Sequence, residues 1–167
     1  MSDLSNDEAL AKLAALIGDH RIATLTTIDT DGAPWSRPMG LQKPDRFDGM
    51  LYFFTSADAD KVEHIARNPK VSVAFAKPSD QEYASMTGTA RVTNDRQKIK
   101  DYWSVSVRAW WPEGPDDPDI RLIEIDVDRA EFWDSPSSVV AHVFGLAKAL
   151  ANGEPASDLG ENAQVEL

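Results

Sequence analysis

The sequence of 167 residues contains no cysteine. This absence excludes disulfides, thiolate catalysis, iron–sulfur clusters and cysteine-based zinc sites. No apolar run approaches the roughly 18 residues that a membrane-spanning helix requires, and the acidic N-terminal segment lacks the basic region and the apolar stretch of a signal peptide. We therefore expect a cytoplasmic protein with no membrane partner.

Positive charge is scarce, because 17 lysines and arginines stand against 28 aspartates and glutamates, which gives a formal net charge of −11. No cluster of basic residues offsets this balance locally, so the chain would repel a phosphate backbone. We therefore expect no nucleic-acid partner. Part of the excess charge lies in residues 152–167, which hold few apolar side chains, and we expect these residues to form a flexible acidic tail.

Metal-binding side chains are sparse as well. The histidines His20, His64 and His142 are far apart in the sequence, and none has a second ligand at the spacing of a metal site. We interpret each of them as a surface histidine or a packed structural one. The acidic segment 116–119 is interrupted by a proline and is typical of a solvated loop. We predict no metal site.

The rest of the chain, residues 1–151, is long enough for one domain with a full hydrophobic core. The segment 21–40 alternates apolar and polar residues on both sides of Asp31-Gly32, which predicts a hairpin of two strands. Gly88 lies inside a later apolar segment and indicates a bulge or a close approach of the neighbouring strand. The further strands that we expect are 50–56, 70–78, 83–94, 121–128 and 129–134.

Helical spacing of apolar residues and terminating residues such as Gly18 predict four helices. The helices that we expect are 5–18, 57–69, 95–103 and 137–150. The proline-rich segment 106–119 predicts a structured loop without a regular element. Strands joined mostly by hairpins, with helices inserted between them, indicate an α+β, mainly β, antiparallel barrel and not a parallel sheet.

A candidate anion site stands where the strand 50–56 runs into the helix 57–69. Thr55, Ser56 and Lys61 would gather at the N-terminus of that helix, where free N–H groups and the helix dipole favour a phosphate. Arg37 on an earlier strand could add a bidentate guanidinium. The alternative is that Ser56 caps the helix and Lys61 is a solvated surface residue, and spacing alone favours this alternative.

Motifs in a fixed order carry a family resemblance. They are SRPMG, LYFFTS, ADKVEHIARNPKVSVAF, SMTGTARV, WWPEGPDDPD and EFWD. Together they resemble the general stress protein 26 group of the pyridoxamine 5'-phosphate oxidase-like FMN-binding split barrels. The similarity spans residues 10–150. It implies an antiparallel split β-barrel of six to seven strands and a homodimer that holds a flavin at the subunit interface, FMN first and FAD as a second candidate.

The resemblance assigns roles to single residues. Arg37 is similar to the arginine that contacts the FMN phosphate and the ribityl chain. Thr55 and Ser56 are similar to a hydroxyl pair at the end of the third strand, and Lys61 is similar to the phosphate-binding lysine. On this basis the resemblance favours the anion site over the alternative of a capping serine and a solvated lysine.

Further residues are assigned to the flavin ring. The backbone of Pro38, Met39 and Gly40 would run beside the edge of the isoalloxazine ring. Trp133 resembles an aromatic residue that reaches the flavin from the partner subunit, and Trp110, with Trp111, would line the same cleft. The alternative for these tryptophans is simple packing in the core or the interface.

The sequence departs from the true pyridoxamine phosphate oxidases near its C-terminus. Those enzymes carry a segment with arginine and histidine that holds the substrate, whereas residues 131–150 offer only a helix with His142. We therefore expect no vitamin B6 oxidation, and the sequence assigns no catalytic residue. The leading hypothesis is an FMN-binding stress-type flavoprotein, a weak oxidoreductase with a nicotinamide nucleotide as candidate electron donor. The alternatives are a non-catalytic flavin-binding or sensing module, or a split barrel that binds deazaflavin or haem.

Overall fold

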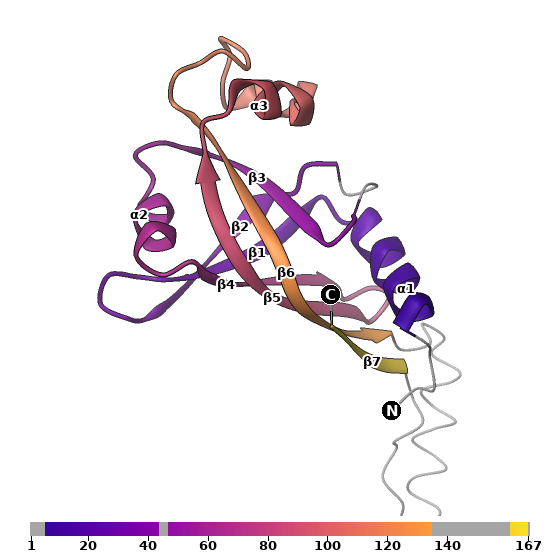
Figure 1. Ribbon diagram of the computed structural model, residues 1–167. Coiled ribbons are helices and arrows are strands. Elements are labelled where there is room, and N and C mark those ends of the chain that lie inside the picture. The colour runs from indigo at the N-terminus through magenta and orange to yellow at the C-terminus, as the bar shows by residue number, and fades with distance from the viewer. Residues whose placement is uncertain (1–5, 44–46, 135–160, 167) are drawn as a thin grey trace, which may run out of the picture.

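The computed structural model describes residues 6–43, 47–134 and 161–166, and Figure 1 shows a curled sheet with helices at its ends and edge. The elements in chain order are α1 (Asn6–Gly18), β1 (Ile22–Ile28), β2 (Pro34–Gly40), β3 (Met50–Ser56), α2 (Asp60–Arg67), β4 (Lys70–Lys77), β5 (Glu82–Thr93), α3 (Arg96–Tyr102), the 3₁₀ helix η2 (Val105–Ala109), β6 (Ile120–Asp134) and β7 (Glu161–Glu166).

The strands form one sheet in the order β2-β1-β4-β5-β6-β3, and β7 pairs with β6. Every pairing between neighbouring strands is antiparallel. The two ends of the sheet, β2 and β3, approach each other through a bridge between Leu41 and Phe53. The sheet is thus rolled into a barrel in which β2 and β3 meet at this bridge and do not pair along their lengths. This confirms the prediction of a mainly β, antiparallel split barrel.

Alternation of side chains builds the core on the inner face of the sheet. Along β1, the inner positions Ala23, Leu25 and Thr27 are buried, while the outer positions are exposed or half-buried. The phenylalanines Phe53 and Phe75 fill the interior, and burial of each such side chain stabilises the fold by about 1.5–3 kcal/mol. Leu13 and Ile17 of α1 and Ile65 of α2 pack into the same core. In Figure 1, α1 and α2 lie at opposite ends of the rolled sheet.

The hairpin predicted at Asp31-Gly32 is confirmed. Pairing of β1 with β2 ends at Ile28 and Pro34. Between them, the Asp29 carboxylate accepts hydrogen bonds from the backbone N–H groups of Asp31 and Ala33, each at 2.9 Å. Gly32 adopts a φ of 87°, in the left-handed region that glycine tolerates without strain.

A single strand, β6, replaces the two strands expected at 121–128 and 129–134. A register shift between Thr87 and Gly88 leaves Asp128 without a partner on β5, so the bulge that the sequence indicated lets β6 bend and continue. Gly88 also makes the close approach: a Cβ at this position would lie 2.3 Å from the backbone oxygen of Asp126. Only glycine fits there without moving backbone.

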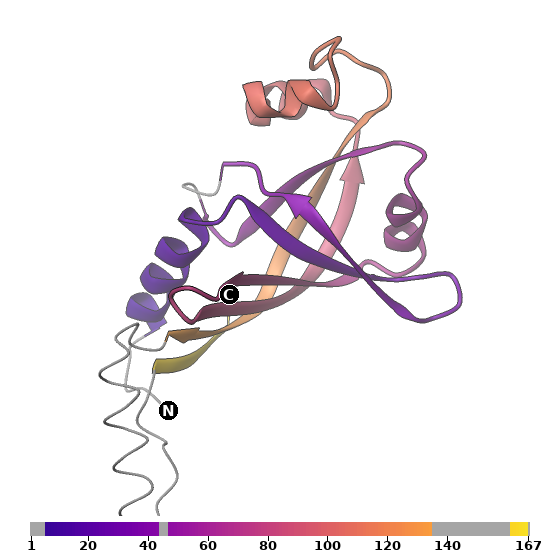
Figure 2. The same cartoon turned by 180° about the vertical axis from the view of Figure 1, so that it is seen from behind.

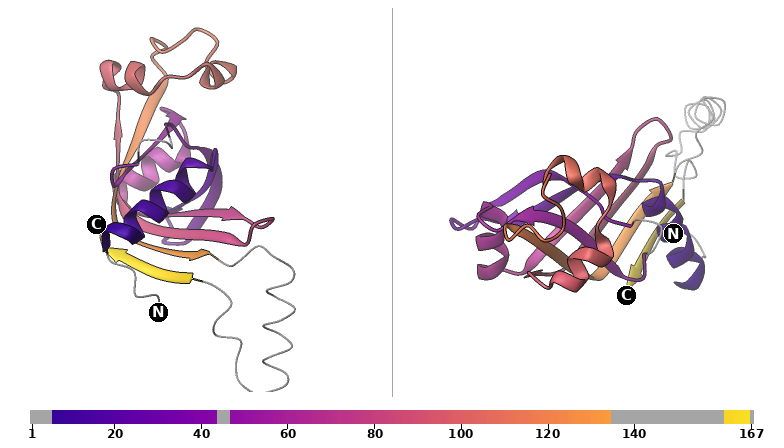
Figure 3. Two further views of the ribbon diagram at one scale, coloured as in Figure 1. Left: turned by 90° about the vertical axis from the view of Figure 1, so that its right-hand side faces the viewer. Right: turned by 90° about the horizontal axis from the view of Figure 1, so that it is seen from above.

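A second, smaller cluster lies on the outer face of β3 and β6, under α3 and η2. Phe54, Ile99 and Leu122 are buried in it. The Asp95 carboxylate caps α3 by accepting from the N–H groups of Gln97 and Lys98 at 3.0 and 3.2 Å. Figures 2 and 3 show α3 and the neighbouring loop standing at one end of the sheet. The segment 106–119, expected to be a loop without a regular element, includes part of the 3₁₀ helix η2.

The C-terminal segment differs from its expectation. The predicted helix 137–150 lies outside the described residues. Within the segment expected to be a flexible acidic tail, Glu161–Glu166 forms β7, and its residues pair with β6 from Arg129 to Asp134. Composition missed this strand because pairing of backbone groups with an existing edge requires few apolar side chains. In the part of the chain that the structure describes, no helix has the length and apolar character to cross a membrane.

Candidate functional site

The end of β3 and the start of α2 form one compact corner. The turn is fixed by backbone hydrogen bonds, from Ala57 N–H to the Asp119 carbonyl at 2.8 Å and from Ala59 N–H to the Ser56 carbonyl at 3.2 Å. Ala59 is the N-cap of α2, and its side chain caps nothing. The N-cap residue therefore supplies no side-chain acceptor to the first turn, where the positive end of the helix dipole favours negative charge and where Asp60 and Glu63 lie.

Thr55 and Lys61 meet at this corner. The Lys61 ammonium donates to the Thr55 hydroxyl across 3.3 Å. The Thr55 side chain is 4% exposed and points to the inner face of the sheet, whereas Lys61 is half-buried. Ser56 is next in the chain and half-buried, but alternation along the strand turns its side chain to the opposite face. The structure therefore brings Thr55 and Lys61 together and leaves Ser56 beside them.

Arg37 reaches the same place from β2. Its Nη1 donates to the Thr27 hydroxyl at 2.7 Å and to the Leu25 carbonyl at 3.5 Å. The guanidinium is half-buried, and burial lowers its pKa, against a smaller opposite effect of Asp60. Arg37 lies close enough to Lys61 for the two charges to repel each other, since Arg37 contributes to the lowered pKa of Lys61.

The electrostatics of Lys61 mark this corner as a place for an anion. Burial lowers the pKa of Lys61 most, Arg37 lowers it further, and Asp60 acts in the opposite direction. Among the residues that the structure describes, neither Lys61 nor Arg37 forms an ion pair within 4.0 Å of a carboxylate. Two partly desolvated positive charges therefore repel each other without a direct counter-ion. A phosphate or a carboxylate placed between them would be favoured by both.

Two further residues belong to the site and were not assigned to it from the sequence. Thr27 is fully buried on β1, and His64 of α2 is 8% exposed. The Thr27 hydroxyl contacts Nδ1 of His64 at 3.0 Å in addition to Arg37. A signal for Thr27 exists in the sequence: it is a hydroxyl at a core position of an alternating strand, and a buried hydroxyl requires partners. His64 follows Lys61 by three positions, which places both on the same side of the helix.

The residues assigned to the flavin ring are placed less uniformly. Pro38 and Gly40 are exposed on β2, the strand at one end of the sheet order, while the Met39 side chain is buried in the core. The Met39 side chain therefore does not border a ligand, whereas the exposed Pro38 and Gly40 could. Trp110 is 81% exposed at the end of η2. Trp133 is 36% exposed near the C-terminal end of β6, whereas the anion corner adjoins the start of β6 at Ile120. Trp133 therefore lies toward the opposite end of β6 from the anion corner of the same chain.

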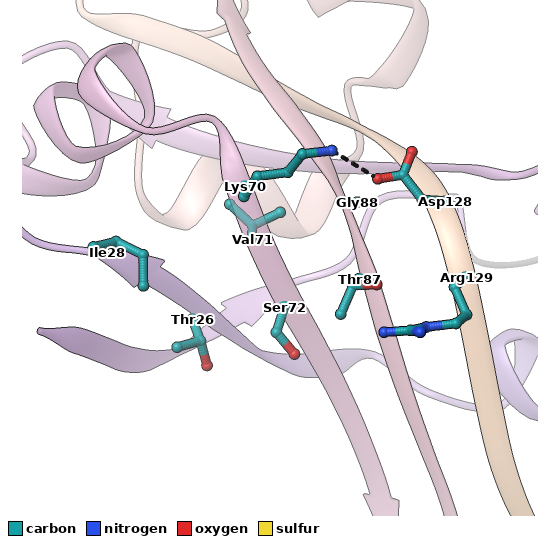
Figure 4. Close-up of a pocket in the computed structure, with 9 residues that line it drawn as sticks. All are labelled: Thr26, Ile28, Lys70, Val71, Ser72, Thr87, Gly88, Asp128 and Arg129. Atoms are coloured by element: carbon teal, nitrogen blue, oxygen red, sulfur yellow. Dashed lines mark hydrogen bonds and ion pairs between the residues drawn. The ribbon is translucent and has the colours of Figure 1, made fainter. Parts of the chain in front are cut away.

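A groove of about 580 Å³ lies elsewhere, on the outer face of β1, β4, β5 and β6. Figure 4 shows the small side chains Thr26, Ser72 and Thr87 on successive strands, with Arg129 beside them. They are direct register partners. The residues of the anion corner do not line this groove, so its polar floor is a separate feature of the sheet.

Small residues occupy the outer positions of β1, β4 and β5 in and around this groove. We call this surface the outer sheet face, and its residues are Thr24, Thr26, Ser72, Ala74, Ser85 and Thr87. Larger apolar side chains, Ile22, Tyr83 and Trp133, lie exposed beyond these positions. Such a face, with small side chains in its middle and apolar ones at its margin, has the character of a surface that another protein chain could cover.

Comparison with known proteins found a matching family model and several relatives. A family model described as Pyridoxamine 5'-phosphate oxidase like matches residues 8–157. Protein bli-3 of Neurospora crassa is 23% identical over 160 residues, which cover 90% of this chain and 77% of that protein. General stress protein 26 of Bacillus subtilis is 26% identical over 127 residues, 74% of this chain and 86% of that protein.

The pyridoxine/pyridoxamine 5'-phosphate oxidase of Shewanella sediminis is 30% identical over 90 residues, which cover 54% of this chain and only 41% of that enzyme. Among solved structures, a general stress protein 26 from a Jannaschia species superposes with a TM-score of 0.75 at 23% identity, over 96% of this chain and 99% of that chain. The general stress FMN/FAD binding protein of Xanthomonas citri superposes with a TM-score of 0.65 at 29% identity, over 77% and 89%.

Proposed function

The chain belongs to the pyridoxamine 5'-phosphate oxidase like family, and we propose that it binds FMN through a phosphate site formed by Arg37, Lys61 and Thr55. The observation that carries this proposal is the pair of half-buried cations around Thr55, with no described carboxylate in an ion pair with either. A phosphate at this corner would neutralise both charges. The name of the Xanthomonas citri relative, an FMN/FAD binding protein, supports a flavin as the source of that phosphate.

The residues present fit the phosphate of a flavin mononucleotide. An arginine offers parallel N–H donors, a lysine offers a mobile ammonium, and a threonine hydroxyl adds one more donor. The N-cap of α2 makes no side-chain hydrogen bond, and a helix N-terminus favours a phosphate. A bound flavin would supply the redox chemistry of the protein, because flavin proteins contribute binding, orientation and electrostatics around the ring.

We place the ring along the edge of β2, beside the backbone of Pro38, Met39 and Gly40, and we propose that a second copy of the chain completes the site. The exposed Trp133 is distant from the anion corner of its own chain, which supports a contact with the partner's flavin. The outer sheet face is the surface that we assign to the dimer. A permanent dimer would bury more than about 2,000 Å² in total.

Catalysis is a further step of the proposal. We propose a weak flavin-dependent oxidoreductase that accepts electrons from NADH or NADPH, and we assign no acid–base residue to it. Stopped-flow reduction of the bound flavin by each nucleotide tests this step. Reduction no faster than that of free flavin would instead support a module that stores or senses flavin.

Pyridoxamine phosphate oxidation is not part of the proposed function. The chain spans about two fifths of the length of the Shewanella sediminis oxidase, and the substrate-binding segment expected from those enzymes has no counterpart that we can assign in the sequence.

The experiment that tests the cofactor is an absorbance spectrum of the purified protein with mass identification of the released ligand. We expect flavin absorption and the mass of FMN. The mass of FAD would identify FAD as the ligand and leave the anion corner as its phosphate site. A deazaflavin or haem spectrum would contradict the proposal of FMN. A colourless protein that fails to take up added FMN would contradict it.

A further inference from the structure

Thr27 carries a hydroxyl group at a core position, where the neighbouring side chains of the strand are apolar. It lies on the inner face of β1 after Ala23 and Leu25, and none of its surface is exposed. Burying an unpaired hydroxyl is costly, so its hydrogen bonds decide whether the position is tolerated. Both partners come from other elements: Nη1 of Arg37 on β2 at 2.7 Å and Nδ1 of His64 on α2 at 3.0 Å.

The donor and acceptor capacity of each group fixes the direction of the bond from Arg37 to Thr27, whereas the direction between Thr27 and His64 depends on the histidine tautomer. A guanidinium can only donate, so the Thr27 oxygen accepts from Arg37. The single hydroxyl proton of Thr27 is then available for His64, whose Nδ1 accepts it when the imidazole is neutral with its proton on Nε2. In that tautomer the order of this relay is Arg37 to Thr27 to His64. Each bond polarises the next, which strengthens the acceptor that Arg37 contacts.

The relay holds a long side chain that would otherwise be free to turn. Arginine loses much rotamer freedom when it is fixed, and in the described residues Arg37 has only the Thr27 hydroxyl and the Leu25 carbonyl as hydrogen-bond partners. Both contacts use Nη1. The remaining N–H groups of the guanidinium are thereby left for another acceptor.

The same relay connects the two cations of the anion corner. His64 and Lys61 lie one turn apart on α2, so the bond from Thr27 to His64 ties the helix that carries Lys61 to β1, and the same Thr27 hydroxyl contacts Arg37 of β2. We propose that Thr27, anchored by His64, is a positioning residue that aims the Arg37 guanidinium at the phosphate of the bound flavin. This inference rests on the proposed function.

The test compares FMN with riboflavin, which share the ring and differ in the phosphate. Thr27→Val keeps the shape of the side chain and removes the hydroxyl, whereas Thr27→Ser keeps the hydroxyl. By fluorescence titration we expect Thr27→Val to bind FMN about tenfold more weakly, the lower end for a lost hydrogen bond to a charged group. Riboflavin affinity should stay within about twofold of wild type. Thr27→Ser should restore FMN binding.

His64 provides a second, independent pair of variants. His64→Asn retains a side-chain acceptor close to the position of Nδ1, and His64→Leu removes it. We expect only His64→Leu to lose the preference for FMN over riboflavin. This pair decides the question if Thr27→Val fails to fold, which circular dichroism would reveal.

Each outcome separates the relay from the phosphate site. Equal losses for FMN and riboflavin in Thr27→Val and in His64→Leu would show a merely structural role and overturn the proposal. Unchanged FMN affinity in both variants would overturn it as well. The wild-type affinities for FMN and riboflavin are measured before any variant is compared. A wild-type protein that binds FMN no better than riboflavin would overturn the phosphate site itself.

Discussion

The Lys61 ammonium lies 3.3 Å from the Thr55 hydroxyl, six positions earlier in the chain. This contact joins Thr55, the last inward-facing residue of β3, to the first turn of α2. It places a positive charge over a buried hydroxyl at a helix N-terminus, and the guanidinium of Arg37 on β2 repels that charge. Three elements of the barrel therefore converge on a single anion-binding corner, and the charges at this corner can be tested one at a time.

Removal of Lys61 should weaken the binding of FMN but not that of riboflavin. Lys61→Ala deletes a charged donor to the phosphate, which is worth about 1.5–3 kcal/mol, or roughly a 10- to 150-fold loss of affinity. Fluorescence titration of both ligands measures the two affinities. Arg67→Ala is the matched control, because Arg67 is an exposed cation at the other end of α2. Equal losses for FMN and riboflavin would show that Lys61 does not bind phosphate.

The affinity for FMN should depend on pH in the alkaline range. Burial and Arg37 lower the pKa of Lys61 below its ordinary 10.5 in the free protein, and a bound phosphate would raise the pKa again because it favours the ammonium. Binding is therefore strongest below the pKa of the free protein and weakens as the pH rises through it. The flavin phosphate, with a second pKa near 6, is already a dianion throughout this range.

The measurement is the ratio of FMN to riboflavin affinity between neutral pH and 10.5. This ratio cancels any titration of the ring, which both ligands share. In Lys61→Arg the guanidinium stays protonated, so the ratio should become nearly independent of pH. A wild-type ratio that is flat over the same range would contradict the assignment of Lys61.

Asp60 should oppose the phosphate. Its charge raises the pKa of both Arg37 and Lys61, so it attracts the two cations and repels an incoming anion. We expect Asp60→Asn to bind FMN about two- to fivefold more tightly, the range for an exposed charge interaction. Asp58→Asn, an exposed change in the same turn, should have a smaller effect. Weaker FMN binding in Asp60→Asn would show that its place at the start of α2 matters more than its charge.

Much of the fold could be predicted because local patterns agree with it. The alternation around Asp31-Gly32 and the glycine at position 88 correspond to the observed hairpin and bulge. The continuity of β6 could not be read from the pattern, since the extra residue Asp128 shifts the alternation and imitates a strand boundary. Strand β7 was missed for a different reason: it is held by pairing with β6, which leaves no apolar periodicity in the sequence.

The candidate site was only partly predictable. Lys61 and Thr55 are close in sequence, and a strand followed by a short helix brings them together. Arg37 was a candidate from the sequence and received its role from a family motif, but its distance from Lys61 depends on how the barrel rolls. Thr27 and His64 are 37 positions apart, and only the closed sheet shows that a threonine at a core position and a histidine classed as structural are partners.

The outer sheet face supplies the last prediction, the oligomeric state. Ala74 is exposed in the middle of this face, between Thr24 and Ser85 on the neighbouring strands. A second copy packed there would leave no room for a long cation, and burial of an unpaired charge is costly. We expect wild type to sediment as a dimer of 18.4 kDa chains and Ala74→Arg to sediment as a monomer, with unchanged circular dichroism.

The same substitution on the exposed surface of α1, Ala11→Arg, is the matched control and should leave the dimer intact. Because the partner's Trp133 is assigned to the flavin, the monomeric Ala74→Arg variant should also release FMN faster, while the phosphate contacts of its own chain remain. Stopped-flow mixing with excess apoprotein measures that rate. A dimer that persists in Ala74→Arg would place the interface on another face. A monomer that holds FMN as long as wild type would instead show that each chain binds its flavin alone.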